Sequence, residues 1–297
     1  MKLGIALGGG GARGFAHIGV LQVLQENKIH VDFVSGTSMG SIIGAMYCET
    51  GDAFEVERRI RQFIDSEEFK KTGIPQARDK VERKENFWDN LSSEIRGRIA
   101  VNIARKRTSL MKEERLHSAV DYLIQIEEFN QCKIPLTVLA TDILNGQDVA
   151  FSTGDIKLAV EASSSVPGFL PPIEYNGYLL SDGGISCPVP VKYARGTPNT
   201  RVVAVAVPPP IKASASMENA IQIMTRAEQI TSSFYTNTQV ERAEVSIFPE
   251  TEDIQWNEFE RMDDMIEYGR AAARIKISDI RRQKNWISSL RQKMFAN

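Results

Sequence analysis

Cysteine and histidine are both scarce in this chain, with three residues of each among 297. The cysteines, Cys48, Cys132 and Cys187, are widely separated, and no two of them form a C-x-x-C pair. Zinc sites and redox dithiols usually depend on such pairs. The sequence therefore predicts no bound metal or cofactor, and we expect reduced thiols, as in cytoplasmic proteins.

Long apolar runs and a strong net charge are also missing. No stretch reaches the roughly 18 apolar residues that a membrane-spanning helix needs, and Lys2 leads into a glycine-rich segment instead of a signal peptide. The formal net charge of −2 gives no general attraction to nucleic acid. We expect a soluble cytoplasmic protein without a nucleic-acid partner, whose contact with a membrane, if any, is peripheral. The sequence leaves its oligomeric state open.

The remaining composition, 42% hydrophobic and 25% charged, is typical of a globular protein. Short apolar runs alternate with longer helical patterns, which predicts strand–helix units around a mostly parallel sheet. Strands are predicted at Leu3–Leu7, Phe33–Val34, Leu136–Ala140, Val149–Ser152, Tyr178–Ser181, Arg201–Val207 and Val245–Phe248. Helices are predicted at Arg13–Leu24, Met39–Cys48, Glu113–Phe129, Met217–Val240 and Asp264–Gln292. We expect a three-layer α/β/α sandwich.

The segment from about Glu67 to Met111 interrupts this alternation, because it is highly charged and has few strand signals. It is predicted to be a helical cap insertion, and its amphipathic basic stretch at 87–107 can either rest on a lipid surface or pack over a site. The chain is therefore predicted to be one α/β domain over 1–297, with a motif-bearing core at about 3–210 and C-terminal elements at about 211–297. A basic stretch at Arg270–Lys293 is expected to form a surface helix, with a docking or oligomer contact as the alternative.

Four consecutive glycines follow the first predicted strand, within the sequence GGGGARG at residues 8–14. Glycine lets the backbone approach a ligand closely, and the N-terminus of the following helix favours negative charge. The segment therefore indicates an anion site, although a tight strand–helix turn without a ligand uses the same residues.

A second motif, GTSMG at residues 36–40, lies between the second predicted strand and a helix of small residues. It matches the G-x-S-x-G nucleophile elbow, in which serine occupies a strained turn with its hydroxyl exposed. Small residues are needed two positions away on each side because neighbouring backbone crowds the turn. Ser38 is therefore the candidate nucleophile, with a simple helix N-cap as the alternative role.

A serine nucleophile needs a base, and the usual histidine is missing from the expected place. In nucleophile-elbow hydrolases the histidine follows the acid late in the chain, whereas His117 is the last histidine here. Asp182 ends an apolar run and precedes Gly183 and Gly184, so its carboxylate is predicted to lie at a strand end. A carboxylate beside a dry cleft can have a raised pKa and act as a base.

Together these motifs resemble those of the patatin-like phospholipases. The resemblance rests on GGGGARG at 8–14, GTSMG at 36–40 and DGG at 182–184, in the order found in that family, and on the proline-containing segment SSSVPGFLPPI at 163–173. It covers roughly residues 3–210.

This resemblance implies a lipid acyl hydrolase in which Ser38 attacks an acyl ester and Asp182 accepts its proton. Arg13 would orient the glycine loop or an anionic head group. The backbone amides implied to hold the oxyanion are those of Gly9, Gly10 and Gly11. The implied supporting glycines are Gly14, Gly36, Gly40, Gly183 and Gly184. The implied partner is a lipid or other acyl ester.

Two other interpretations remain open at this point. Gly9, Gly11 and Gly14 also fit a Rossmann dinucleotide fingerprint, but that motif needs an acidic residue at the end of the second strand. Asp32 instead precedes the apolar pair Phe33–Val34. The scaffold could also belong to a non-enzymatic regulator or binding protein, because a fold does not dictate a function.

Overall fold

The structure is a computed structural model that describes residues 1–71, 109, 113–209, 211, 217, 220–251 and 254–294. The predicted helical cap at 67–111 lies outside the described residues, except for a short helix at Glu67–Lys71 and the single residue Ser109.

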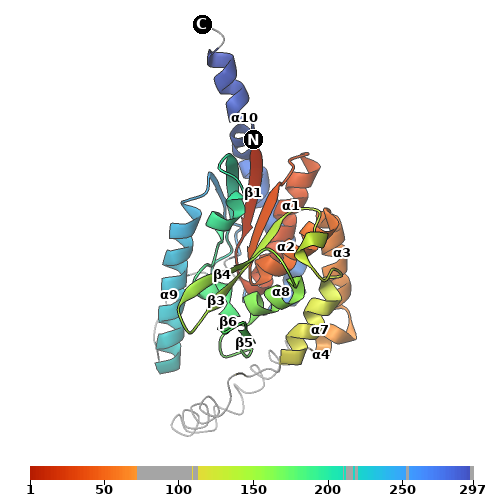
Figure 1. Cartoon of the computed structure of the whole chain (residues 1–297), viewed down its shortest axis with the longest axis vertical. Helices are drawn as coiled ribbons and strands as arrows, with labels where there is room; N and C mark the ends of the chain where they lie inside the picture. Colours follow the sequence, from red (N-terminus) through yellow and green to blue (C-terminus); the bar gives the residue numbers. More distant parts are fainter. Residues whose placement is uncertain are drawn as a thin grey trace.

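A mixed sheet forms the centre of the molecule (Figure 1). Its strands are β1 (Lys2–Leu7), β2 (Phe33–Thr37), β3 (Leu136–Asp142), β4 (Gln147–Phe151), β5 (Ile173–Tyr175), β6 (Tyr178–Asp182), β7 (Thr200–Val205) and β8 (Val245–Ile247). Their order is β5-β6-β3-β2-β1-β7-β8, and β4 pairs with β3. In the stretch β3-β2-β1-β7-β8 of this order, adjacent strands are parallel. The pairs β3–β4, β3–β6 and β5–β6 are antiparallel.

Helices and short 3-10 turns connect these strands. The α-helices are α1 (Ala16–Glu26), α2 (Met39–Thr50), α3 (Ala53–Ile64), α4 (Glu67–Lys71), α7 (Glu113–Leu123), α8 (Ile156–Ser164), α9 (Ala220–Val240) and α10 (Met262–Met294). The 3-10 turns are η1 (Gly11–Phe15), η2 (Phe129–Gln131), η3 (Gly183–Ile185), η4 (Val191–Arg195) and η5 (Phe259–Arg261).

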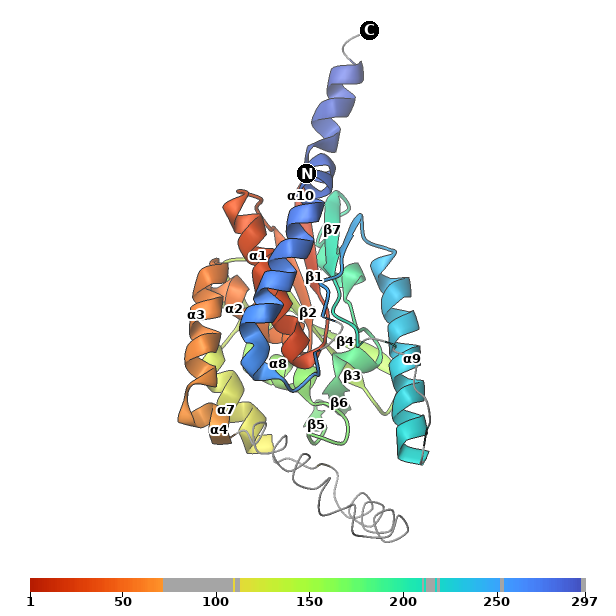
Figure 2. The same ribbon diagram turned by 180° about the vertical axis from the view of Figure 1, so that it is seen from behind.

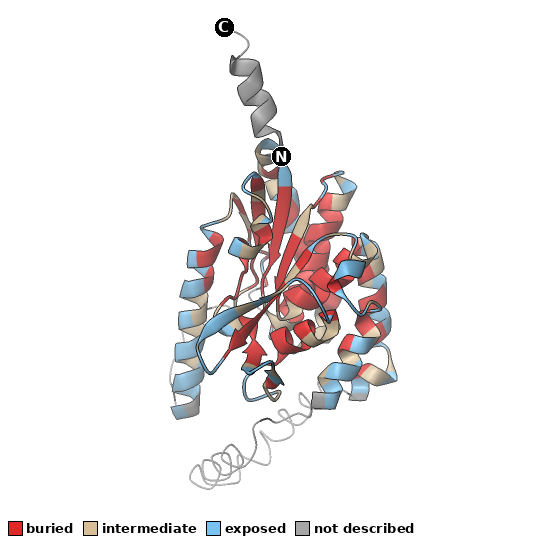
Figure 3. Ribbon diagram, viewed as in Figure 1, coloured by how far each residue is buried: buried red, intermediate tan, exposed pale blue. Residues whose placement is uncertain are grey.

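Both faces of the sheet are covered, as the predicted three-layer α/β/α arrangement requires. Successive side chains of a strand point to opposite faces. In β7, Val203 and Val205 join the main core under the helices α1, α2 and α10, whereas Val202 and Ala204 join a smaller core with η4 and the end of α9. Figure 2 shows the helices of the first face, and Figure 3 shows that the central strands are buried. The predicted fold class is confirmed.

The C-terminal helix α10 packs directly on α1 by its first half. A side chain at Gly19 would overlap the carbonyl of Ile266, and one at Gly269 would overlap the carbonyl of Ala16, so glycine at both positions allows the close crossing. Arg270 donates to Glu26 at 2.7 Å and to Gln22 at 2.8 Å. The start of the basic C-terminal stretch therefore serves packing within the chain.

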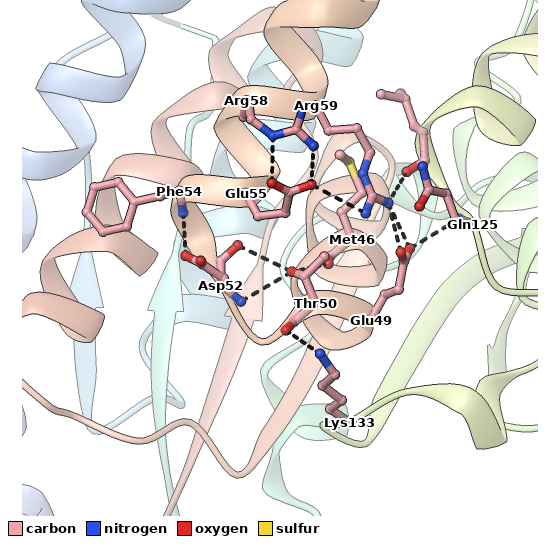
Figure 4. Close-up of polar contacts among 11 residues, drawn as sticks. Met46, Glu49, Thr50, Asp52, Phe54, Glu55, Arg58, Arg59, Gln125 and Lys133 are labelled. Carbon is pink, nitrogen blue, oxygen red and sulfur yellow. Dashed lines mark hydrogen bonds and ion pairs between the residues drawn. The ribbon is translucent and has the colours of Figure 1, made fainter.

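A buried ion pair joins three helices at one side of the sheet (Figure 4). The guanidinium of Arg59 on α3 donates to Glu49 of α2 at 2.9 Å and to the carbonyl of Leu123 at 2.9 Å. This carbonyl ends α7, and Gln125 donates its backbone N–H to Glu49. The carbonyl of Leu123 and the N–H of Gln125 therefore bond to side chains of α3 and α2 instead of continuing the helix. As a result α7 ends at Leu123, whereas the helix predicted from the sequence extended from Glu113 to Phe129.

Every strand predicted from the sequence is present, with ends shifted by a few residues. The helix predicted from Arg13 begins with the 3-10 turn η1 before α1, and Gly51 ends α2 in a left-handed conformation. The helices α3 and α8 and the short strand β5 were not predicted. Within the described residues, no helix is both long enough and apolar enough to span a membrane.

Candidate active site

Ser38 occupies a strained turn between β2 and α2. β2 ends at Thr37 and α2 begins at Met39, and Ser38 has φ 53° and ψ −126°. A non-glycine residue held in such a region costs about 1–3 kcal/mol, so the surrounding structure must impose it. Its carbonyl accepts from Ser41 N at 2.8 Å and Ser41 Oγ at 2.7 Å, and its backbone N–H donates to Ser163 Oγ at 2.9 Å. The predicted outlying conformation of Ser38 is confirmed.

The two glycines of the elbow have no room for a side chain. A Cβ on Gly36 would overlap the carbonyl of Gly40, and a Cβ on Gly40 would overlap the carbonyl of Leu7 in β1. The turn therefore lies directly against the end of the neighbouring strand, and this contact brings Ser38 to the glycine loop.

The glycine loop at residues 8–11 lies beside Ser38. A Cβ added to Gly9 would lie 3.3 Å from Ser38 Cβ. Gly9 donates its backbone N–H to Pro188 O at 3.0 Å, so this amide already has a partner within the protein. Neither Gly10 nor Gly11 donates its amide to another part of the described chain. Of the three amides implied for an oxyanion hole, the structure thus leaves those of Gly10 and Gly11 free to bind a ligand.

Two buried side chains, Arg13 and His17, follow this loop in the chain. Arg13 Nε donates to Val207 O and its Nη1 donates to Ile254 O, both at 3.2 Å. Burial lowers the pKa of this guanidinium to about 10, so it stays charged at neutral pH. His17 Nε2 lies 2.7 Å from Gly8 O, and burial lowers the pKa of its imidazole to about 4. His17 is therefore neutral and donates to the carbonyl of Gly8 in the loop. The Arg13 guanidinium donates instead to the backbone carbonyls of Val207 and Ile254, in other segments of the chain.

Asp182 ends β6 and is held by three hydrogen bonds, two with backbone groups and one with a threonine hydroxyl. Its N–H donates to Ser165 O at 3.0 Å, its carbonyl accepts from Thr141 Oγ1 at 3.0 Å, and its Oδ1 accepts from Gly184 N at 2.7 Å. A Cβ on Gly183 would overlap the carbonyl of Leu139, so this tight turn requires glycine.

The Ser38 side chain lies within reach of the Asp182 carboxylate and favours its ionised form. Burial raises the pKa of this carboxyl to about 6, and the hydrogen bonds from Ser38 and Gly184 limit the rise. Neither His17 nor His117 bridges the two side chains. His17 contacts Gly8, and His117 Nδ1 lies 2.8 Å from Glu161. A hydroxyl on a strained turn, beside a carboxylate with a raised pKa, is an arrangement suited to nucleophilic attack assisted by a base.

Asp32 does not lie where a dinucleotide site would need it. Its Oδ2 accepts from Leu3 N at 2.8 Å, at the start of β1, whereas the glycine loop follows the other end of that strand. The acidic residue of a Rossmann fingerprint must reach the ribose near the glycine loop. This geometry argues against the dinucleotide interpretation.

Some residues of the site were not found from the sequence. Ser163 Oγ and Ser165 O accept the backbone N–H groups of Ser38 and Asp182, and the only signal for these serines was their place in the proline-containing segment. The backbone carbonyl of Trp256 accepts from Ala12 N at 2.7 Å, beside the glycine loop. No local motif surrounds Trp256, so its position depends on tertiary packing alone.

Known proteins are similar to this chain over about two thirds of its length. An uncharacterised NTE family protein of Mycobacterium bovis is 28% identical over 206 residues, which are 69% of this chain and 49% of that protein. A lysophospholipase of Meyerozyma guilliermondii is 28% identical over 205 residues, 69% of this chain and 12% of that protein. The chain thus spans about half of its mycobacterial relatives and a small part of others.

Among solved structures, VipD from Legionella pneumophila aligns with a TM-score of 0.49 at 14% identity, covering 95% of this chain and 67% of that chain. The family model described as patatin-like phospholipase matches residues 5–195. That match includes the glycine loop, the serine elbow and Asp182, and it spans well over half of the sequence. The chain belongs to the patatin-like phospholipase family.

Proposed function

We propose that this chain is a serine lipid acyl hydrolase, in which Ser38 is the nucleophile and Asp182 is its general base. The observation that carries the proposal is the contact of the Ser38 side chain with a buried carboxylate whose pKa is raised to about 6. Such a carboxylate is ionised at neutral pH and is basic enough to accept a proton. The family of the chain and the name of its lysophospholipase relative support a lipid ester as the substrate class.

In the proposed reaction, Ser38 Oγ attacks the acyl carbonyl carbon while its proton passes to Asp182. The resulting oxyanion accepts hydrogen bonds from the free amides of Gly10 and Gly11. Loss of one such donor typically costs about 2.7–4 kcal/mol of transition-state stabilisation. Collapse of the intermediate expels the alcohol, which takes the proton from Asp182 and leaves an acyl ester on Ser38.

Water then attacks this acyl ester, and Asp182 accepts a proton from the water. When the second tetrahedral intermediate collapses, Ser38 Oγ leaves and takes that proton back, and the fatty acid is released. Each proton taken up by Asp182 is returned within the same half-reaction. The cycle therefore restores the starting enzyme and needs no co-reactant other than water.

Labelling with a fluorophosphonate tests this proposal directly, because the reagent modifies activated serines. We expect a single adduct in the intact mass of the wild type, mapped to Ser38, and no adduct on Ser38→Ala. Ser118→Ala is a matched control, because Ser118 is an exposed serine on α7 whose Oγ only donates to Glu114 O at 2.8 Å. Equal labelling of wild type and Ser38→Ala, with no Ser38-dependent ester hydrolysis, would favour a binding protein on the same scaffold.

The proposal also includes peripheral contact with a lipid surface through α9. Three large apolar side chains of this helix are exposed, with exposed fractions of 54% for Ile223, 71% for Met224 and 71% for Phe234. Apolar residues on a surface helix can enter the boundary of a lipid layer. Flotation with phosphatidylcholine vesicles tests this: Phe234→Ser should reduce binding, whereas Ile275→Ser, at an equally exposed isoleucine of α10, should not.

A further inference from the structure

The segment Ile254–Trp256 forms part of the candidate active site although it lies beyond the family match at 5–195. Trp256 O accepts from Ala12 N at 2.7 Å, and Ile254 O accepts from Arg13 Nη1 at 3.2 Å. A Cβ on Gly11 would lie 3.1 Å from Trp256 Cβ. Trp256 is therefore placed directly beside one of the two free amides of the glycine loop.

A second loop borders the site on the side of Asp182. Ser163 Oγ accepts the backbone N–H of Ser38, and two residues later Ser165 O accepts that of Asp182. The chain then turns back, with Phe169 N donating to Val166 O at 3.1 Å. Phe169 is thus carried by a loop whose beginning is bonded to both members of the proposed dyad.

The tips of the two loops meet through their aromatic side chains. The ring centroids of Phe169 and Trp256 lie 4.9 Å apart in an edge-to-face arrangement, at 65°. Although the rings contact each other, Phe169 is 37% exposed and Trp256 is 39% exposed. Together they present an apolar surface that begins at the glycine loop and ends on the loop that holds Ser38 and Asp182.

We propose that Phe169 and Trp256 form the subsite that binds the acyl chain of the substrate. The inference rests on the proposed acyl hydrolase function. An acyl carbonyl at Ser38 that directs its oxygen to the amides of Gly10 and Gly11 brings its hydrocarbon chain close to Trp256. A hydrocarbon chain gains free energy when it leaves water for an apolar surface, and the gain grows with each methylene group. The aromatic pair should therefore select for chain length.

The test is the dependence of hydrolysis on acyl length, measured with acetyl, butyryl, octanoyl and dodecanoyl p-nitrophenyl esters. For Trp256→Ala and Phe169→Ala we expect kcat/KM to fall roughly tenfold for the dodecanoyl ester, mainly through KM, and less than about twofold for the acetyl ester. Phe54→Ala is the matched control, because Phe54 is 43% exposed and lies at the start of α3, beyond the far end of α2. Its profile should equal that of the wild type.

An equal loss for all four esters would overturn the proposal, because it would mean that the rings only position the glycine loop. An unchanged profile in both variants would overturn it as well. A selective loss of long-chain hydrolysis in Ile185→Ala, with none in the aromatic variants, would place the chain on the other side of Asp182, where Ile185 is 48% exposed.

A binding measurement separates this inference from the proposed reaction. In the Ser38→Ala background, which needs no turnover, a fluorescent fatty acid such as cis-parinaric acid should bind several-fold more weakly after Trp256→Ala. If the wild type hydrolyses no ester but this loss of affinity is seen, the subsite stands and the reaction does not. If Ser38-dependent hydrolysis is found while the affinity is unchanged, the reaction stands and the subsite is refuted.

Discussion

The hydroxyl of Ser38, at the start of α2, lies beside the buried carboxylate of Asp182 at the end of β6 and favours its ionised form. The two residues come from distant parts of the chain and meet because β2 and β6 both border β3. Because of this contact, pH and substitutions at either residue should change activity and stability in measurable ways.

Ester hydrolysis should increase with pH through a midpoint near 6. The proposed base is active only when ionised, and burial raises the pKa of Asp182 from 3.8 to about 6. The measurement is kcat/KM for a short-chain ester as a function of pH, since this quantity reports groups of the free enzyme. A rise centred near 4, the ordinary value of an exposed aspartate, would contradict the role given to the buried carboxylate.

Asp182→Asn should change how stability depends on pH. Between pH 3.8 and about 6 the folded state binds the Asp182 proton more tightly than the unfolded state, so this group lowers stability as pH rises, by roughly 3 kcal/mol in total. His17 acts with the opposite sign. The pKa of His17 is lowered from 6.5 to about 4 by burial, so its contribution is lost as pH falls through this range.

The two effects should therefore nearly cancel in the wild type between pH 4 and 6. In Asp182→Asn the His17 effect is no longer offset, and the free energy of unfolding should rise more steeply with pH over that interval than in the wild type. Urea titrations at several pH values measure this difference. Parallel curves for wild type and Asp182→Asn would show that the carboxyl is not buried as described.

Replacing Ser38 by glycine should stabilise the fold relative to replacing it by alanine. At φ 53° and ψ −126° a Cβ is strained, so we expect Ser38→Gly to be more stable than Ser38→Ala by about 1 kcal/mol. Ser41 provides a matched control three residues later in the regular part of α2, where the same pair of substitutions should have the opposite order, because glycine is the poorer helix former. Thermal unfolding of the four variants gives the comparison.

Gly10→Ala should lower kcat more than it raises KM, because the added methyl group displaces an amide that serves the transition state. Its Cβ would lie 2.6 Å from Val207 Cγ2. Removing that methyl group with Val207→Ala should restore part of kcat. Gly154→Ala is the control for a glycine replaced elsewhere in the chain: nothing lies within 4 Å of its added Cβ, and although its φ of 79° strains the backbone and should lower stability, kcat should be unchanged.

Ser38→Ala and Asp182→Asn should each abolish nearly all turnover, and the double variant should be little worse than either. Residues that act as a unit in one step give such non-additive losses. Asp263→Asn, at an exposed aspartate of α10, is the control for the loss of one carboxylate. Additive effects of Ser38→Ala and Asp182→Asn on kcat would show that the two residues act in separate steps.

The elements of this fold differ in how much of their signal lies in the local sequence. The central strands β1, β2, β3, β7 and β8 were recognisable because buried parallel strands consist of short, nearly continuous apolar runs. The end of α7 at Leu123 was not recognisable, because it depends on Arg59 and Glu49 from other helices. The helix α8 was missed because its small residues Ala162, Ser163 and Ser164 give a weak helical pattern.

By itself, the sequence determined the alternation of strands and helices, the serine elbow at Ser38 and the absence of a late histidine. These features are local or compositional, so they can be read without the fold. Only the tertiary structure decided that the backbone N–H of Gly9 donates to Pro188 O, that burial raises the pKa of Asp182 to about 6, and that Trp256 lies against Gly11. Hydrogen-bond partners, desolvation and close packing depend on segments that are distant in the chain, and no local pattern specifies where those segments meet.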